Sequence, residues 1–575
     1  MTTVDWRLYW HSLHFLSWRQ IVFRLFRPLR RGRARFSLLC PFRKAWFDPV
    51  YPDTLRTLLS TAAEKGATER ISLDALRKFQ FHYLNRTFQE DEVLLWQRQD
   101  LPKLWLYHLH GFRGAREFSM APLLTPHLGD RDRVLVWMHN WIRHNPPGRG
   151  VGWDGWPLSE RLISWPVLLA VYHIKDKDII QSYAQQARWL YHTAEHDLQG
   201  NHLLKNALAL TLAGSLLEDS RICRYGTALL KAELEKQILP DGGHVERSLL
   251  YHNELLWDSL IVLSLLQEAP SFLVSAIRKM ASFTRVLCHP DGDIPLFGDA
   301  SLNESPLPQV LCACADVLTD TACTVDIQRT DCSLACPASG YFLLGDFCAG
   351  SVMIVKTAAP SPAHQAAHSH GDMLSYELSL SGKRIIVDTG THGYAESPYR
   401  AHCRSTSAHN VLTPEGREQA EHWSNFRMAR RAEALPASLQ KTEKGCRFAG
   451  AVKYYQGGVY HRRIEFDAQS VCWEICDYLS PDCLDGSPIS HIHFHPACTV
   501  HWHEPDRELL IIRDKVRVLL TIRNIEYIES SQLEMCSYFP KFGVMQSGTV
   551  LTLLGRPGEA GSRAYQIRWL PNLES

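Results

Sequence analysis

The sequence predicts a multidomain α+β protein in which a helical half precedes an antiparallel β half. The spacing of apolar residues changes from a helical period to short β-branched runs near residue 339. A chain of 575 residues is also too long for one compact core. Hydrophobic residues at 45% and charged residues at 21% exclude the disordered, collagen-like and coiled-coil classes. We therefore expect a basic and aromatic extension at 1–50, a helical domain at 51–335 and a β domain at 336–575.

Seven of the arginines in the extension alternate with apolar residues: Arg19, Arg24, Arg27, Arg30, Arg31, Arg33 and Arg35. This pattern is typical of an amphipathic helix on an anionic membrane surface. It also fits a solvated helix that packs on the main domain by its aromatic side. We recognise no basic region before an apolar stretch and no small-residue cleavage site, so no standard signal peptide is expected.

The helical half shows apolar residues at helical spacing over 51–285, with short Gly, Pro and Asp punctuation between segments. A succession of helical hairpins is typical of an α/α toroid or solenoid. The clearest helical segments are LSERLISWPVLLAVYHI, QSYAQQARWLYHTAEHDL, HLLKNALALTLAGSLL and YHNELLWDSLIVLSLLQEA.

The β half contains short β-branched or aromatic runs with turn residues between them, which predict an antiparallel sheet domain, a sandwich. A cleft between the helical half and the β half is a natural ligand site. The runs include GYFLLGDF, SVMIVKT, SYELSLSGKRIIVDTG, GVYHRRIEFD, SVCWEICDYL, ISHIHFHP and TVLTLLG.

The net charge, the composition and the cysteine spacing indicate which classes of ligand and site the chain can have. The 62 basic and 61 acidic residues leave a formal charge of +1, so no global field attracts nucleic acid. The 28 His and 17 Trp suit a sugar cleft. The 16 cysteines signal neither a disulfide framework nor a thiolate zinc site, although Cys312 with Cys314 and Cys472 with Cys476 stay open as pairs. No apolar run is long enough to predict a transmembrane segment.

Two polar motifs precede predicted helices. Asn201, in Gly-Asn-His, stands where an N-cap is expected, and residues 241–247 (DGGHVER) lead toward Tyr251. Because helix N-termini expose N–H groups and a positive dipole end, both motifs suit a bound carboxylate. The alternative is structural, with a cap, a glycine turn and a core tyrosine.

A third motif lies in the β half, at 368–410. His368 and His370 share one face of an extended segment, Asp388 follows the run KRIIV, and His409 ends the motif. Two imidazoles and a carboxylate, from His370, Asp388 and His409, would make a zinc site of nitrogen and oxygen ligands.

The order of these motifs resembles the heparinase II/III superfamily, which includes alginate-type lyases. The motifs are GNH, DGGHVERSLLYH, HSHGDMLSYELSLSGKRIIVDTGTHGY and RSTSAHN, with LWLYHLHGF and GWDGWPLSERLISW upstream. The resemblance implies an N-terminal incomplete (α/α) toroid followed by a C-terminal antiparallel β-sandwich. It also implies a polysaccharide lyase that cleaves a uronic-acid-containing glycan by β-elimination.

The resemblance assigns roles to individual residues. Asn201 and His202 would neutralise the sugar carboxylate, which favours the enolate-like transition state. Tyr251 and His368 would carry the proton transfers, and Tyr394 resembles a second tyrosine in the cleft. Which group is base and which is acid depends on the geometry of the cleaved sugar and stays open.

Further residues complete the predicted site. The resemblance implies that Zn2+ bound by the His370 set organises the β-side wall of the cleft and orients His368. His244, Glu246 and Arg404 are substrate-binding candidates, although Arg404 would equally stabilise its loop. One strand face holds three histidines, which predict either a second metal site or an ordinary strand: His491, His493 and His495.

Two other functions stay open. A glycoside hydrolase on a similar toroid needs two carboxylates, for which Glu160, Glu246 and Asp258 are available. The other is a noncatalytic glycan-binding protein of an exopolysaccharide system. The expected partner is an anionic polysaccharide of heparan, alginate or exopolysaccharide type, with a homodimer possible. Relatives favour the periplasm or cell envelope, and the cytoplasm stays open.

Overall fold

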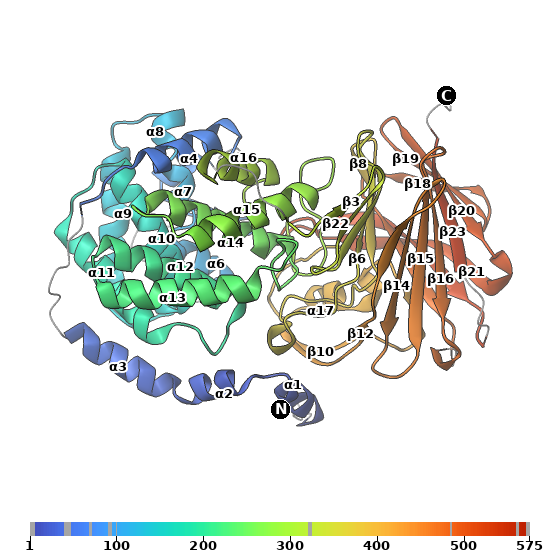
Figure 1. Cartoon of the computed structure of the whole chain (residues 1–575), viewed down its shortest axis with the longest axis horizontal. Helices are drawn as coiled ribbons and strands as arrows, with labels where there is room; N and C mark the ends of the chain where they lie inside the picture. The colour runs from blue at the N-terminus through green and yellow to red at the C-terminus, as the bar shows by residue number, and fades with distance from the viewer. Residues whose placement is uncertain are drawn as a thin grey trace.

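Helices build the N-terminal half of the molecule and two antiparallel sheets build the C-terminal half (Figure 1). The computed structural model describes residues 6–39, 48–67, 72–89, 95–98, 100–319, 325–483, 486–558 and 563–570. The predicted order, an incomplete α/α toroid followed by an antiparallel β domain, is confirmed.

The toroid is built from helical hairpins around two helices that are buried on nearly every side. These are α12 (Gly200–Leu216) and α14 (Leu249–Leu265), which are apolar around most of their circumference and therefore lie inside the ring. Both lie within segments that the apolar period predicts. The other toroid helices are α4 (Asp53–Glu64), α5 (Leu73–Arg77), α6 (Lys103–Gly111), α7 (Ala115–Phe118), α8 (Ala121–Leu124), α9 (Asp130–His144), α10 (Gly155–Val171), α11 (Lys177–Thr193), α13 (Ser220–Gln237), α15 (Ser271–Val286) and α16 (Pro308–Thr319). A small hairpin, β1 (Gln80–Tyr83) with β2 (Arg86–Gln89), follows α5.

The β domain consists of two large antiparallel sheets whose facing sides share one core. Leu378 from one sheet and Phe448, Trp473 and Ile567 from the other are fully buried in that core. The first sheet has the order β21 (Ile528–Tyr538), β22 (Gln546–Gly555), β17 (Ile489–Phe494), β8 (Lys383–Ile386), β7 (Tyr376–Leu380), β6 (Ser351–Lys356), β5 (Tyr341–Asp346), β4 (Ser333–Cys336), β3 (Gln328–Arg329). The second has the order β12 (Glu433–Ala434), β14 (Gly445–Lys453), β15 (Val459–Asp467), β16 (Cys472–Leu479), β23 (Arg563–Trp569), β20 (Val516–Arg523), β19 (Glu508–Arg513), β18 (Thr499–Glu504).

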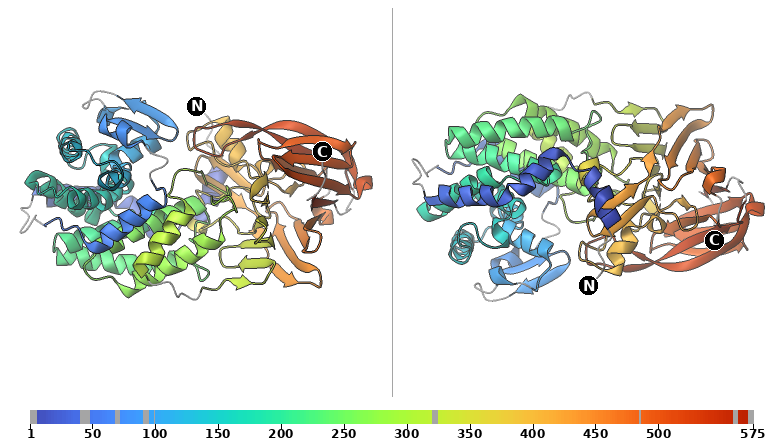
Figure 2. Two further views of the ribbon diagram at one scale, coloured as in Figure 1. Left: turned by 90° about the horizontal axis from the view of Figure 1, so that it is seen from above. Right: turned by 90° about the horizontal axis from the view of Figure 1, so that it is seen from below.

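The N-terminal segment forms three helices that run along one side of the molecule, from the toroid to the β domain (Figures 1 and 2). They are α1 (Trp6–His14), α2 (Trp18–Leu25) and α3 (Arg27–Leu39). The segment does pack on the main body, since α3 contacts α11 and α1 contacts β11 (Arg427–Arg431). The prediction that its aromatic side makes this contact is confirmed for Tyr9, which packs on Trp423, and for Phe23, which stacks on His196. It is wrong for Trp6, Trp10 and Trp18, which are 68–76% exposed.

The cysteine pairs that the sequence leaves open are not disulfides. Cys312, Cys314, Cys472 and Cys476 are all free thiols. In the part of the chain that the structure describes, no helix is both long and apolar enough to cross a bilayer.

Candidate active site

Tyr251, His368 and Tyr394 meet where the toroid faces the β domain. Tyr251 lies on α14, His368 in the loop before β7, and Tyr394 in the loop after β8. The hydroxyl oxygens of Tyr251 and Tyr394 are 2.5 Å apart and share a hydrogen bond. The His368 ring centroid lies 4.1 Å from that of Tyr251 and 6.0 Å from that of Tyr394. Three residues predicted from separate motifs therefore form one cluster.

Asp299 organises the β-domain side of this cluster. Its carboxylate accepts from Nδ1 of His368 and from Nε2 of His370, each at 2.9 Å, and it forms an ion pair with the Arg400 guanidinium. Burial favours the neutral acid, but Arg400 and the two imidazoles outweigh it and hold the pKa of Asp299 well below its usual value. Asp299 thus orients His368 through a hydrogen bond in this structure.

Asn201 lies in the first turn of α12 and is not its N-cap, which is Gln199. Its backbone N–H donates to Oε1 of Glu246 at 2.8 Å and its side-chain amide donates to Oε2 at 2.6 Å. Burial opposes the charge on Glu246, but His244 and His368 lower its pKa, so a carboxylate already occupies this helix N-terminus. Glu246 therefore positions the Asn201 amide.

His202 follows Asn201 on α12 and lies beside a carboxylate. Its Nδ1 lies 3.2 Å from Oε2 of Glu195, which also accepts from the Asn206 amide at 3.1 Å. Burial lowers the pKa of His202, but the Glu195 carboxylate outweighs burial and raises it. The His202 side chain is 23% exposed, so an anion can reach this imidazolium.

Both tyrosines are neutral phenols near neutral pH. Burial raises the pKa of Tyr251 well above its ordinary value, and the nearby Asp299 carboxylate adds to the effect. Burial and the neighbouring Tyr251 raise the pKa of Tyr394 in the same direction. A neutral phenol is ready to donate a proton and poorly suited to accept one.

The predicted zinc ligands lie close to one another, and two of the three fit a metal. Nδ1 of His409 lies 2.7 Å from Oδ2 of Asp388, and the rings of His370 and His409 are 5.6 Å apart. Nδ1 of His370 and Nε2 of His409 are buried without a hydrogen-bond partner, as expected for nitrogens that await a metal ion. Asp388 is engaged by His409 instead, and no three His, Cys, Asp or Glu side chains in the described part of the chain are arranged around a common centre.

Arg404 and His244 lie buried and bonded to the protein. The Arg404 Nη1 donates to the Ser424 carbonyl at 2.6 Å, and burial lowers the pKa of this guanidinium to about 9. His244 shares a hydrogen bond of 2.9 Å with the Gln237 side chain. Both contacts stabilise loops beside the cluster, while Nε and Nη2 of Arg404 are buried without a hydrogen-bond partner among the described residues.

The three histidines near the end of β17 do not share one set of partners. The backbone N–H of His493 donates to the Asn410 side chain at 2.7 Å, and its ring contacts the same oxygen at 3.1 Å. His491 stacks on His493, whereas His495 packs against Tyr538. This is the packing of an ordinary strand.

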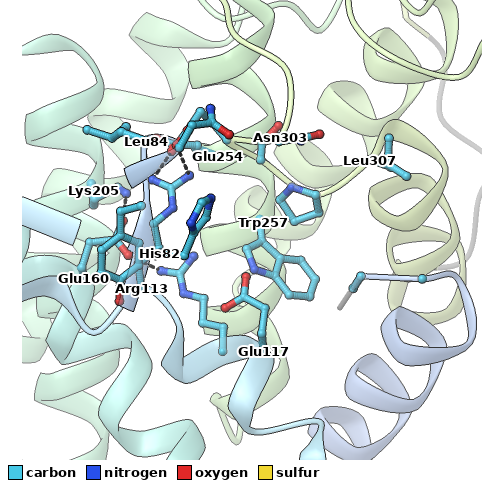
Figure 3. A pocket seen from close by; sticks show the side chains of 18 residues that line it. His82, Leu84, Arg113, Glu117, Glu160, Lys205, Glu254, Trp257, Asn303 and Leu307 are labelled. Carbon is cyan, nitrogen blue, oxygen red and sulfur yellow. Dashed lines mark hydrogen bonds and ion pairs between the residues drawn. The ribbon is translucent and has the colours of Figure 1, made fainter. Parts of the chain in front are cut away.

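A polar cavity of about 120 Å³ opens one helical turn along α14 from Tyr251 (Figure 3). Nη1 of Arg113 pairs with Glu254 across it at 2.8 Å, and Lys205 and Glu160 line its floor. Burial, reinforced by Glu254, raises the pKa of Glu304 in its wall to about 7. No sequence motif singles out Glu304, because its environment comes from packing between distant segments.

Two protein-family models together match most of the chain. A family model described as Heparinase II/III N-terminus matches residues 63–322, and one described as Heparinase II/III-like, C-terminal matches residues 328–570. A crystal structure of Heparinase III shares the fold, with a TM-score of 0.67 and 18% identity over 89% of this chain and 85% of that chain.

One relative of the chain is named as an enzyme, and another is named for its localisation with FtsZ. The chain is 24% identical over 360 residues to a heparin-sulfate lyase of Pedobacter heparinus, which covers 56% of this chain and 53% of the relative. It is 26% identical over 363 residues to the FtsZ-localized protein C of Caulobacter vibrioides, which covers 60% of this chain and 59% of the relative. The chain thus spans little more than half the length of these relatives.

Proposed function

Because the chain belongs to the heparinase II/III family, we propose that it is a polysaccharide lyase that cleaves a uronic-acid-containing glycan by β-elimination. The observation that carries the proposal is the convergence of His368, Tyr251 and Tyr394, together with the effect of His368 on Glu246, the carboxylate that holds Asn201. Elimination requires three tasks of such a site: neutralising the sugar carboxylate, removing the C5 proton and protonating the O4 leaving group.

Carboxylate neutralisation falls to His202 and Asn201. The raised pKa of His202 keeps its imidazolium charged to higher pH than an isolated histidine, and its partial exposure leaves it accessible. The Asn201 amide has a second N–H to donate once Glu246 has accepted the first. Both donors interact more strongly as charge moves onto the carboxylate, so they favour the transition state over bound substrate.

Proton transfer divides between His368 and Tyr251. Asp299 accepts from Nδ1 of His368, which fixes the ring and leaves Nε2 for removal of the C5 proton. Tyr251 is a neutral phenol within van der Waals distance of that ring and protonates O4. Tyr394 holds the Tyr251 hydroxyl in place through their shared hydrogen bond.

We propose that His370 and His409 hold a zinc ion, with Asp388 orienting His409 through the hydrogen bond to its Nδ1. The two unpartnered buried nitrogens support this proposal. When bound, the ion would brace the β-domain wall of the site, since elimination consumes no water that a metal would have to activate. Elemental analysis of the purified protein should find about one zinc per chain, and His409→Ala should abolish it. Absence of metal from protein prepared without chelator contradicts this assignment.

A hydrolytic alternative has one observation in its favour, the raised pKa of Glu304, which is typical of a general acid. The acids that the sequence offers for this role are less suitable. Glu160 and Asp258 both form ion pairs with Lys205 and Arg116. Burial favours the protonated form of Glu160, but Arg116 and Lys205 outweigh it and lower its pKa to about 2.

A panel of uronate polysaccharides tests the proposal. The wild-type protein should release products that absorb in the ultraviolet because they carry a C4–C5 double bond, and His368→Ala should not. Since the chain is also similar to a protein named for FtsZ localisation, calorimetric binding of a glycan without turnover would favour a noncatalytic role.

A further inference from the structure

The N-terminal helices α1–α3 present large apolar side chains to solvent. Trp6 and Trp10 are 76% and 74% exposed, and Trp18, Leu25 and Leu39 are 68%, 73% and 81% exposed. Single exposed apolar residues are ordinary on protein surfaces, but a row of them on one segment marks an interaction surface.

These side chains fall on one face of each of the first two helices. Trp6, Trp10 and Leu13 are spaced by one helical turn along α1, and Trp18, Val22 and Leu25 repeat the spacing along α2. These side chains therefore form a continuous exposed stripe only when α1 and α2 are folded as helices.

The opposite face of the segment is fixed to the protein. Nε1 of Trp423 donates to the Ser12 hydroxyl at 2.9 Å, and the Arg30 guanidinium donates to the Ala194 carbonyl at 2.7 Å. Gln20 and Ala34 are buried between the segment and the main body. Because the inner face is already used, the outer apolar stripe has no role in holding the segment in place.

The charges of the segment have one sign. Residues 6–39 contain eight arginines and neither Asp nor Glu. At 3.6 residues per turn, Arg19 and Arg24 lie on either side of the α2 stripe, and Arg33 and Arg35 flank Phe36 on α3. The whole chain has a formal charge of only +1, so this excess is local.

An apolar stripe with tryptophans and flanking arginines matches the interface of an anionic phospholipid bilayer, where rings enter the headgroup region and guanidinium groups meet phosphates. A second copy of the chain is a poorer match, since symmetric pairing of this face would place arginines against arginines. We propose that residues 6–39 dock the protein on the surface of an anionic membrane.

Docking would hold the candidate site beside the membrane. α1 packs on β11, and the turn between β10 (Ala420–Ser424) and β11 carries Phe426. The Phe426 ring centroid lies 5.2 Å from that of Tyr394 and 6.3 Å from that of His368. The hairpin of β10 and β11 thus contacts both the N-terminal segment and the candidate site.

Vesicle co-sedimentation of the full chain tests the proposal independently of catalysis. The wild type should bind vesicles of phosphatidylcholine with about one third phosphatidylglycerol, and should bind pure phosphatidylcholine at least about tenfold more weakly. A charge variant, Arg19→Gln with Arg24→Gln and Arg33→Gln, should lower the partition coefficient on anionic vesicles about a hundredfold. Raising the salt concentration should weaken wild-type binding in the same direction.

An apolar variant and a matched control distinguish docking through this segment from nonspecific hydrophobic adsorption to vesicles. Trp10→Ser with Trp18→Ser and Leu25→Ser should lower the partition coefficient at least about a hundredfold. Leu128→Ser with Met535→Ser, which removes exposed apolar side chains elsewhere, should bind like the wild type. Circular dichroism and melting temperature confirm that each protein is folded.

Three results would overturn the proposal. The first is a folded wild type that does not sediment with anionic vesicles, and the second is equal binding by the apolar variant and the control. The third is vesicle-free self-association that the apolar variant abolishes, which would assign the face to a second copy of the chain. Since all readouts are binding, they remain decisive whether or not the protein is a lyase.

Discussion

Replacing Tyr251 with Phe removes one oxygen atom from the centre of the candidate site. Its hydroxyl makes a 2.5 Å hydrogen bond to Tyr394, and leaving that partner unpaired costs about 1–3 kcal/mol of unfolding free energy. Loss of a general acid typically lowers the rate about 10²–10⁴-fold. Because Tyr251 is a neutral phenol beside His368, we expect Tyr251→Phe to lower kcat at least about a hundredfold.

Tyr394→Phe is the matched control, because it breaks the same hydrogen bond and keeps the proposed acid. The unfolding free energy, from urea titration, should fall by a similar amount in both variants, whereas kcat of Tyr394→Phe should fall by no more than about tenfold. Initial rates follow from the ultraviolet absorbance of unsaturated products on a glycan that the wild type cleaves. Equal losses of kcat in the two variants would refute the assignment of Tyr251 as the acid.

Two further perturbations test the charges around the cluster. Asp299→Asn should lower the unfolding free energy by about 3–5 kcal/mol, because the buried Arg400 guanidinium loses its carboxylate; an unchanged urea midpoint would contradict this. Glu195→Gln removes the carboxylate that raises the pKa of His202, so the imidazolium should deprotonate at lower pH. The alkaline fall in kcat/KM should then move to lower pH, and a pH profile with an unmoved alkaline limb would show that His202 does not bind the substrate carboxylate in its charged form.

The fold could be predicted largely from local patterns. Segments such as the one that becomes α12 carry apolar residues on every side, and only an interior helix tolerates that composition. Strands such as β6 are short β-branched runs between turn residues. The surface position of the N-terminal segment was less predictable, since its arginines and aromatic residues fit both a packed and a docking face. Three-dimensional packing decides that Ser12 and Gln20 turn inward and Trp10 turns outward.

The candidate site was predictable where its residues stand in motifs that the family resemblance covers. Tyr251, His368 and Tyr394 stand in motifs that the resemblance names, and they do meet. Asp299 escaped prediction because its importance depends on partners far along the chain, and no local period records such pairings. Glu195 lies only seven positions before its partner His202, but it belongs to none of the motifs. Asp299 reaches His370 across 71 positions of sequence.

The mass of the products formed in isotopically labelled water tests β-elimination most directly. At each cut, digestion of a uronate glycan should give one new non-reducing end that carries an unsaturated ring. The products should take up no labelled oxygen, and the unsaturated fragment should be lighter by one water than the corresponding hydrolysis product. Saturated ends that carry the labelled oxygen would contradict elimination and direct attention to Glu304 as the acid of a hydrolase.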